Sequence, residues 1–159
     1  MLLPQYPEVR MRLSAEESRR RAAGADHGVL STARPDGSID SVPVCFAIDG
    51  DLVVTAIDDV KPKAGGTLRR VADLEADPRA TLLCERWDPD DWSNLWWTRL
   101  RLRRQAAPAS ATAALEAALR RRYRQYAEAT FAAVLVFRID EATGWSAERE
   151  PETPDRRRG

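Results

Sequence analysis

The hydrophobic positions of the chain follow two periods, one typical of strands and one typical of helices. In the stretch 95–105, Leu100 and Leu102 alternate with arginines, which predicts a strand with one face toward solvent. Short turns at 35–38 (PDGS) and 49–51 (DGD) should join three strands into an antiparallel meander. The strands that we expect are 28–34, 39–48, 52–56, 80–87, 95–105 and 131–140.

Three segments carry helical signals. Ser14 followed by Glu17 is a capping box, which predicts a helix over residues 14–25. A short helix should start at Thr67 and end at the Asp-Pro pair 77–78. A longer one is predicted over 110–130, because apolar residues recur on one face of it, namely Leu115, Leu119, Tyr123 and Tyr126.

About six strands in hairpin order, with helices at the start, in the middle and before the last strand, do not follow a βαβ pattern. They favour a mainly β (α+β) fold, a small antiparallel barrel with peripheral helices. A chain of 159 residues can build one such domain with its own core, which we place at 1–147. Residues 148–159 are charged and contain two prolines, and we expect them to form a frayed tail.

Composition narrows the class of protein. Twenty-five basic and 25 acidic residues cancel, which argues against a nucleic-acid partner. Cys45 and Cys84 lie in apolar runs and are expected to be buried thiols of a reducing compartment. His27 is the only histidine and there is no CxxC, so we expect no metal. No run approaches 18 apolar residues and the N-terminus lacks a leader pattern, which predicts a cytoplasmic protein without a membrane partner.

Protein-supplied catalytic groups do not stand out. Ser31, Thr32 and Ser41 have only His27 as a candidate base, and no GxSxG surrounds any of them. The chain also lacks a GxGxxG and a Walker loop. If the protein is an enzyme, a bound cofactor therefore carries the chemistry.

The most distinctive polar stretch runs from Val53 to Arg70. A strand end is followed by Lys61 and Lys63 on either side of a proline, by two glycines, and by the expected helix start at Thr67. Cations and backbone N–H groups at a helix N-terminus suit an anion such as a phosphate or a carboxylate. Loop lysines are more often simply solvated, and this second interpretation stays open.

Four tryptophans fall within eleven residues beside an acidic loop, namely Trp87, Trp92, Trp96 and Trp97. Aromatic side chains favour burial in a core or an interface, although one or two could form the wall of a site for a planar ligand. Together with the alternating Leu100 and Leu102, this segment offers more apolar surface than a lone barrel should expose. The pattern therefore favours a homodimer.

Several of these segments together resemble a known family. These segments are the run GVLSTARPDGSIDSVPVCFAIDGDLVV, then Thr55, Lys61 and Lys63, and then LRRVADLEADPRATLL and DDWSNLWWTRLR. Together they are similar to the split β-barrel flavin and deazaflavin oxidoreductases, the relatives of pyridoxamine 5′-phosphate oxidase. The likeness is greatest to the actinobacterial branch associated with coenzyme F420, and the terminal GWSA resembles that branch too. It covers about residues 20–147. The chain departs from the pattern at Leu102, where relatives often have glycine, and at Gly65-Gly66, which lengthens the lysine loop.

The resemblance implies an FMN-binding split-barrel-like fold and a homodimer with two cofactor sites at the subunit interface. By resemblance, the phosphate and ribityl portion of the cofactor is held at Thr55, Lys61 and Lys63. The following helix start corresponds to Thr67, Leu68 and Arg69. The strand along the isoalloxazine-like ring corresponds to Val42, Pro43 and Val44. An interface segment from the partner subunit corresponds to Trp92 and Ser93.

The function that the resemblance implies is hydride transfer between coenzyme F420 and a small conjugated or planar substrate. The two lysines suit either F420 or FMN, and the abundant arginines modestly favour the longer anionic tail of F420. One alternative is an FMN-dependent oxidase or reductase on the same fold. Another is a non-enzymatic protein that binds a flavin, a tetrapyrrole or a fatty acid.

Overall fold

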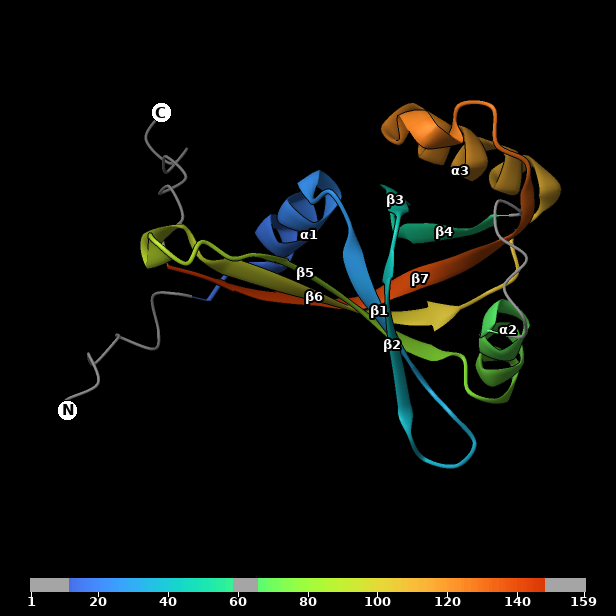
Figure 1. Cartoon of the computed structure of the whole chain (residues 1–159), viewed down its shortest axis with the longest axis horizontal. Helices are drawn as coiled ribbons and strands as arrows, with labels where there is room; N and C mark the ends of the chain where they lie inside the picture. Colours follow the sequence, from blue (N-terminus) through green and yellow to red (C-terminus); the bar gives the residue numbers. More distant parts are fainter. Residues whose placement is uncertain (1–11, 59–65, 148–159) are drawn as a thin grey trace, which may run out of the picture.

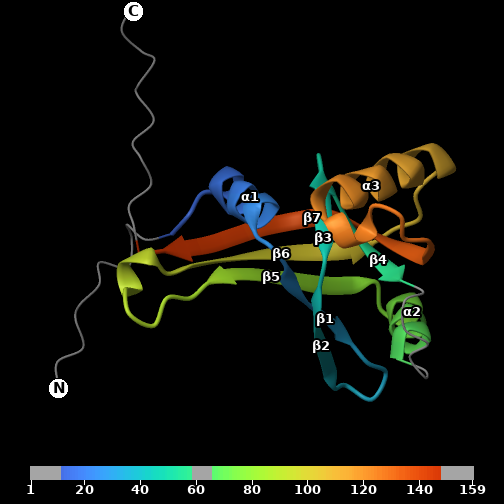
Figure 2. The same ribbon diagram turned by 45° about the horizontal axis from the view of Figure 1, so that its top comes forward.

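The computed structural model describes residues 12–58 and 66–147, which form a curled, antiparallel, seven-stranded sheet with three α-helices (Figures 1 and 2). The strand order is β2-β1-β5-β6-β7-β4-β3. The strands are β1 (Gly28–Ala33), β2 (Ile39–Val44), β3 (Phe46–Asp49), β4 (Leu52–Asp58), β5 (Arg79–Arg86), β6 (Trp96–Arg104) and β7 (Phe131–Ser146).

A bend at Cys45 closes the sheet into a barrel. The expected single strand 39–48 is in fact two strands, β2 and β3, and these lie at the two opposite edges of the sheet. Because one residue joins them, the bend brings the two edges together, and the strand count rises from the expected six to seven. The flanking turns are confirmed: Gly37 and Gly50 have φ of 85° and 57°, a region that glycine adopts without strain.

The helices begin where the sequence predicts, but one ends early. In α1 (Ala15–Gly24), the Ser14 hydroxyl accepts the Glu17 N–H at 3.1 Å, which confirms the cap. The helix α2 spans Gly66–Ala76 and α3 spans Ala109–Arg122. The α3 prediction was too long, because Tyr123 turns to an extended backbone and a short helix η2 (Arg124–Tyr126) follows. None of the helices in the described ranges combines the length and apolarity that a bilayer crossing requires.

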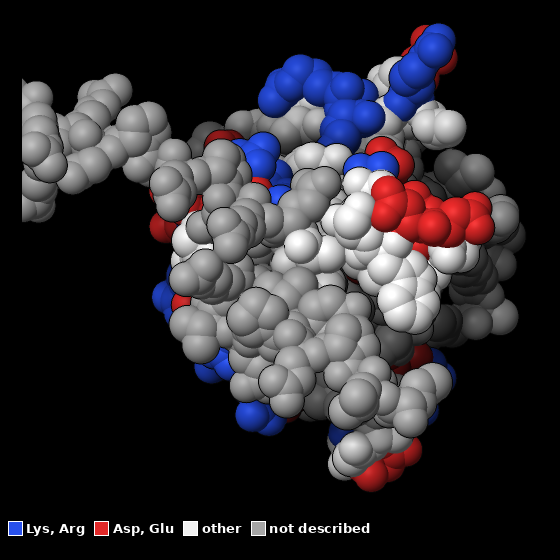
Figure 3. Space-filling view, turned by 90° about the vertical axis from the view of Figure 1, so that its left-hand side faces the viewer, with Lys and Arg blue, Asp and Glu red and all other residues white. Residues whose placement is uncertain are grey.

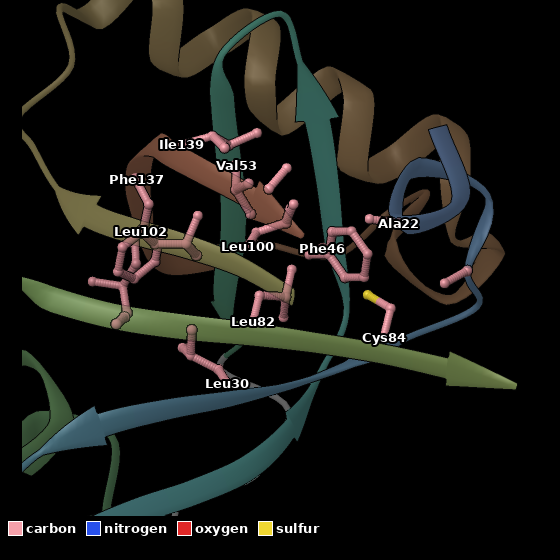
Figure 4. Packing of buried hydrophobic residues seen from close by; sticks show 14 of the residues in the cluster. Ala22, Leu30, Phe46, Val53, Leu82, Cys84, Leu100, Leu102, Phe137 and Ile139 are labelled. Atoms are coloured by element: carbon pink, nitrogen blue, oxygen red, sulfur yellow. The ribbon is translucent and has the colours of Figure 1, made fainter. Parts of the chain in front are cut away.

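Alternate residues of the curled sheet fill the inside of the barrel. Leu100 and Leu102 are fully buried there, whereas Arg101 and Arg103 on the same strand are exposed. The alternation in this strand is therefore confirmed, but these leucines offer no surface to a second subunit, and that part of the homodimer argument was wrong. The core residues labelled in Figure 4 include Leu30, Phe46, Val53, Leu82, Leu100 and Phe137.

A second apolar cluster lies on the other side of β4 and β7, beneath α3. Leu115 and Leu119 of the predicted helical stripe are buried in it against Val54 and Val136. The helix α1 packs against β6 and β7, with Ala22 and Ala25 in the core of the barrel, whereas α3 packs against β3 and β4 (Figure 1). The two helices therefore cover opposite sides of β7.

The two cysteines differ in burial. Cys84 lies inside the barrel, and burial raises the pKa of its thiol to about 12. The thiol therefore stays protonated near neutral pH and acts as a small packing group, as the sequence predicts. Cys45, at the bend, is only partly buried, and both cysteines are free.

Close packing at Gly144 joins α1 to the sheet. The strand β7 continues past its expected end at 140, and Gly144 lies opposite Thr98 of β6. A Cβ at Gly144 would lie 2.8 Å from the Trp97 carbonyl oxygen and 2.9 Å from the Ser18 hydroxyl. We therefore expect Gly144→Ala to lower the free energy of unfolding by about 1–3 kcal/mol, measured by denaturant titration.

The matched control is Gly24→Ala at the last residue of α1, where no atom lies within 4 Å of an added Cβ. Alanine is the better helix former, so this variant should be at least as stable as the wild type. If both variants had the same stability, the close contacts around Gly144 would not be the reason that this position requires glycine.

Candidate functional site

The connection from β4 to α2 carries the predicted anion-binding residues. Lys61 and Lys63, the only lysines in the chain, lie outside the described residues. The structure describes the elements on either side of them. Thr67 and Leu68 lie in the first turn of α2, as predicted for the helix start. The segment 59–65 must therefore join the end of β4 to the N-terminal turn of α2.

Two arginines and one aspartate form a cluster beside this helix start. Arg69 Nη2 lies 3.8 Å from Asp40 Oδ2 on β2. The neighbouring Arg70 is half-buried, and burial lowers the pKa of its guanidinium, while the charge of Asp40 opposes that effect. Asp40 carries one negative charge against two positive ones, so the cluster keeps an excess positive charge. The sequence prediction included Arg69 but missed Asp40 and Arg70, because the pairing of β2 near α2 has no local signal.

The other predicted strand residues point in different directions. Thr55 lies opposite Phe46 of β3 and is buried on the inner side of the barrel with Val53. Val42 lies opposite the buried Leu30, and Val44 packs against the core. Pro43 alone of the β2 triplet is exposed on the outer side, opposite Val29. A ring placed along this segment from outside would therefore meet the Pro43 side chain and the β2 backbone.

The register of the strands arranges the outer side of the sheet in rows. One row runs across the strands through Pro43, Val29, Leu83, Arg99 and Thr143. The next row runs through Ser41, Ser31, Thr81, Arg101 and Glu141, and in it the Ser31 and Ser41 hydroxyls lie 2.8 Å apart. A groove of about 490 Å³ lies over the second row and the adjoining strand ends. The apolar residues Pro43, Val29 and Leu83 of the first row thus lie beside a polar groove.

The aromatic segment forms the tip of the β5–β6 hairpin. The Asp88 carboxylate accepts the N–H groups of Asp90 and Asp91 at 3.0 and 3.1 Å, and a short helix, η1 (Trp92–Asn94), follows. Trp87 and Trp92 are 63% and 60% exposed, with ring centroids 6.0 Å apart. Figure 3 looks onto this end of the molecule, where acidic side chains gather beside uncharged ones. Two exposed aromatic rings therefore accompany a negatively charged turn.

This tip lies at the opposite end of the long strands from α2 (Figures 1 and 2). Trp92 and Ser93 therefore do not meet the other predicted site residues within one chain. Trp96 and Trp97, in contrast, are partly buried at the start of β6, where Arg99 lies over the Trp97 ring at 5.4 Å. Among the described residues, no group of three histidine, cysteine or acidic side chains is arranged to hold a metal ion.

Comparison with known proteins identifies the fold. No protein-family model and no curated protein matches the sequence. Among solved structures, an FAD-binding protein of Mesorhizobium loti superposes with a TM-score of 0.58 at 17% identity, over 84% of this chain and 93% of that one. An FMN-binding protein of Syntrophomonas wolfei gives 0.61 at 15% identity, over 85% and 90%. A putative pyridoxamine 5′-phosphate oxidase of Corynebacterium glutamicum gives 0.54 at 16% identity, over 84% and 94%.

The chain has the split-barrel fold. This fold is shared with proteins named for flavin binding and for pyridoxamine phosphate oxidation, and the expected fold is confirmed. At these identities the likeness concerns the fold. The F420 branch of the family stays a prediction.

Proposed function

We propose that this protein is an oxidoreductase that transfers a hydride between coenzyme F420 and a small conjugated or planar substrate. The observation that carries the proposal is the excess positive charge of Arg69 and Arg70 over Asp40 at the helix start that follows the two lysines. A phosphate-bearing cofactor needs such cations beside its anionic group. Similar solved structures are named for FAD and FMN binding, which supports a flavin-type cofactor.

The donor set fits a phosphorylated deazaflavin. In the proposal, Lys61, Lys63 and Arg69 bind the anionic part, and the outer side of β2 at Pro43 orients the ring. When bound, the deazaflavin supplies the hydride, so the chain need only position the two reactants and exclude water. FMN remains the alternative, favoured by the FMN-binding structure of the same fold, because one phosphate could occupy the same cations.

We also propose that two chains share each site as a homodimer. The hairpin tip is acidic and aromatic, whereas the start of α2 carries Arg69 and Arg70 and follows Lys61 and Lys63. Two copies related by a two-fold axis, with their long strands antiparallel, would place the tip of each near the α2 end of the other. Trp92 and Ser93 of the partner would then join the cofactor site, which accounts for their distance from it within one chain.

Titration of the purified protein with F420, FMN and haem tests the cofactor assignment. We expect F420 to bind most tightly, with the oxidised cofactor absorbing at about 420 nm and FMN at about 450 nm. Preferential binding of FMN would select the alternative on the same fold. Binding of haem alone would leave a non-enzymatic carrier as the function.

A labelling experiment tests the chemistry. The described residues offer no Ser/His or paired-carboxylate constellation at this site, and His27 is exposed in the connection between α1 and β1. Deuteride placed on the cofactor ring should therefore appear in the product, the rate should vary only weakly between about pH 6 and 8, and His27→Ala should retain most activity. Loss of the label to water, or a hundredfold loss in a folded His27→Ala variant, would contradict direct transfer without protein acid–base help.

A further inference from the structure

A pocket of about 350 Å³ lies between the end of α1 and the ends of two strands. One wall is the connection from α1 to β1, residues 24–27, and the other consists of Glu85 and Arg86 at the end of β5 and Trp96 at the start of β6. The helix α2 precedes the opposite end of β5, so the pocket is separate from the charged cluster at the start of α2. Small-molecule sites span about 300–1,000 Å³, and this volume therefore suits a ligand much smaller than a flavin.

Trp96 gives the pocket an apolar wall that is already fixed in place. Its ring is partly buried and packs against the core of the barrel. The Arg21 guanidinium lies 5.7 Å from the centroid of this ring, and Arg21 Nε donates in turn to the Glu17 carboxylate at 2.8 Å. Because these neighbours hold the ring, an apolar group that packs against it does not have to order it first.

The charged side chains that line the pocket have no partners in the part of the chain that the structure describes. Asp26, Glu85 and Arg86 form no ion pair and no side-chain hydrogen bond there, although both signs of charge are present. The arginines that line the groove on the outer side of the sheet differ, since each of them pairs with a carboxylate, as Arg101 does with Glu141 at 3.0 Å. The pocket therefore has unused capacity to bind charged groups.

Asp91, at the hairpin tip, is the nearby carboxylate whose charge acts on Arg86. Its two oxygens accept hydrogen bonds from Ser93, at 2.6 Å, and from the Asn94 side chain, at 2.8 Å. The Arg86 guanidinium keeps all five of its N–H donors for another acceptor.

We propose that this pocket binds a free α-amino acid with an apolar side chain. Arg86 pairs with the carboxylate of the ligand, Asp26 and Glu85 with its ammonium group, and Trp96 packs against its side chain. A purely anionic ligand would meet the two carboxylates, and a purely cationic one would meet Arg86, whereas a zwitterion gains charge-assisted contacts at both ends. The inference goes beyond the proposed function and does not depend on the identity of the cofactor.

Calorimetric titration with L-phenylalanine and two of its derivatives tests the ligand class. The N-acetyl derivative lacks the ammonium charge, and the amide derivative lacks the carboxylate charge. Each should bind at least about tenfold more weakly than L-phenylalanine, because one charge-assisted contact is lost. L-Leucine, the second probe, should bind as the intact zwitterion does. Failure of both amino acids to bind at about millimolar concentration, or equal binding of either derivative, would overturn the proposal.

Two variants locate the ligand in the pocket. Arg86→Gln should weaken L-phenylalanine binding at least about tenfold and should no longer distinguish the amino acid from its amide. Asp26→Asn combined with Glu85→Gln should likewise no longer distinguish it from the N-acetyl derivative. All three replaced side chains are exposed, so both variants should fold, which thermal unfolding can verify.

The matched control is Arg101→Gln, which removes the same charge from the groove on the outer side of the sheet and should keep the wild-type affinity for L-phenylalanine. An Arg86→Gln variant that binds as tightly as this control would show that the amino acid binds elsewhere. Titration with F420 or FMN is a separate measurement, so absence of amino-acid binding would not count against the proposed function, and absence of cofactor binding would not count against this pocket.

Discussion

Replacing Lys61 and Lys63 together by alanine is expected to weaken binding of coenzyme F420 at least tenfold, with little change in the unfolding midpoint. A charge-assisted contact to phosphate contributes about 1.5–3 kcal/mol, and about 1.4 kcal/mol corresponds to a tenfold change in affinity. Arg69 and Arg70 remain in the variant, so some affinity should persist. A fluorescence titration of the cofactor measures the change in affinity. The ionic strength must be kept constant, because salt screens the interactions between exposed charges.

A control must remove the same amount of charge elsewhere. Arg121 and Arg124 are exposed at the end of α3 and in η2, and the double replacement of these two by alanine lowers the net charge equally. Its cofactor affinity should match the wild type. Equal affinity of the lysine variant and this control would mean that the two lysines are merely solvated.

The lysines allow a second measurement, because they are the only two in the sequence. An amine-selective acylating reagent can modify these side chains and the α-amino group alone. Saturating cofactor should slow modification at both lysines and not at the α-amino group. Mass spectrometry of the digested protein reports each position separately.

Local patterns were enough to predict most of the elements. In β6 the predicted alternation is confirmed, because one side of the strand faces the core and the other faces solvent. A strand in this position has apolar and polar residues in alternation. The glycines at 37 and 50 sit at positive φ, where a side chain would be strained, so the turn signals were reliable. The cap at Ser14 depends on a residue three positions away and was equally visible.

Features that depend on distant segments escaped prediction. The division of 39–48 into two strands follows from their different partners, because β2 pairs with β1 and β3 pairs with β4. The sequence between Val44 and Phe46 contains no signal for this division. The cluster of Asp40 with Arg69 and Arg70 likewise joins residues about thirty positions apart. Leu100 and Leu102 were assigned to a surface because a period of two shows that a strand has two faces but not which partner covers the apolar one.

The early end of α3 also depends on residues that are distant from it in the sequence. The Tyr123 hydroxyl accepts the Phe46 N–H at 3.1 Å and lies 3.0 Å from the Asp26 carbonyl oxygen, to which it can donate. Arg122 donates to the carbonyl oxygens of Ala23, at 2.5 Å, and Ala25. The end of α3 thus holds the end of α1 and the first residue of β3, at the bend that closes the barrel.

Replacing Arg122 by alanine should therefore lower the free energy of unfolding by about 2–4 kcal/mol, because two hydrogen bonds from a charged donor are lost and the carbonyl groups at the end of α1 lose their partner. The guanidinium also lies over the Phe46 ring at 4.8 Å, a contact that is lost as well. For a domain of this size the unfolding midpoint should fall by about 5–15 °C, measured by differential scanning calorimetry.

Arg121→Ala is the matched control, because Arg121 is the exposed neighbour of Arg122 and carries the same charge. This variant should change the free energy of unfolding by less than about 0.5 kcal/mol. Arg122→Lys should recover little of the lost stability, because a single ammonium group cannot reproduce the planar fork that reaches both carbonyl groups.

The Arg122→Ala replacement should also affect the proposed cofactor site. Pro43 lies three residues before Phe46 on the bent segment, so a loosened bend should weaken cofactor binding even well below the unfolding midpoint. An Arg122→Ala variant as stable as Arg121→Ala would show that the bend at Cys45 is held by the core alone.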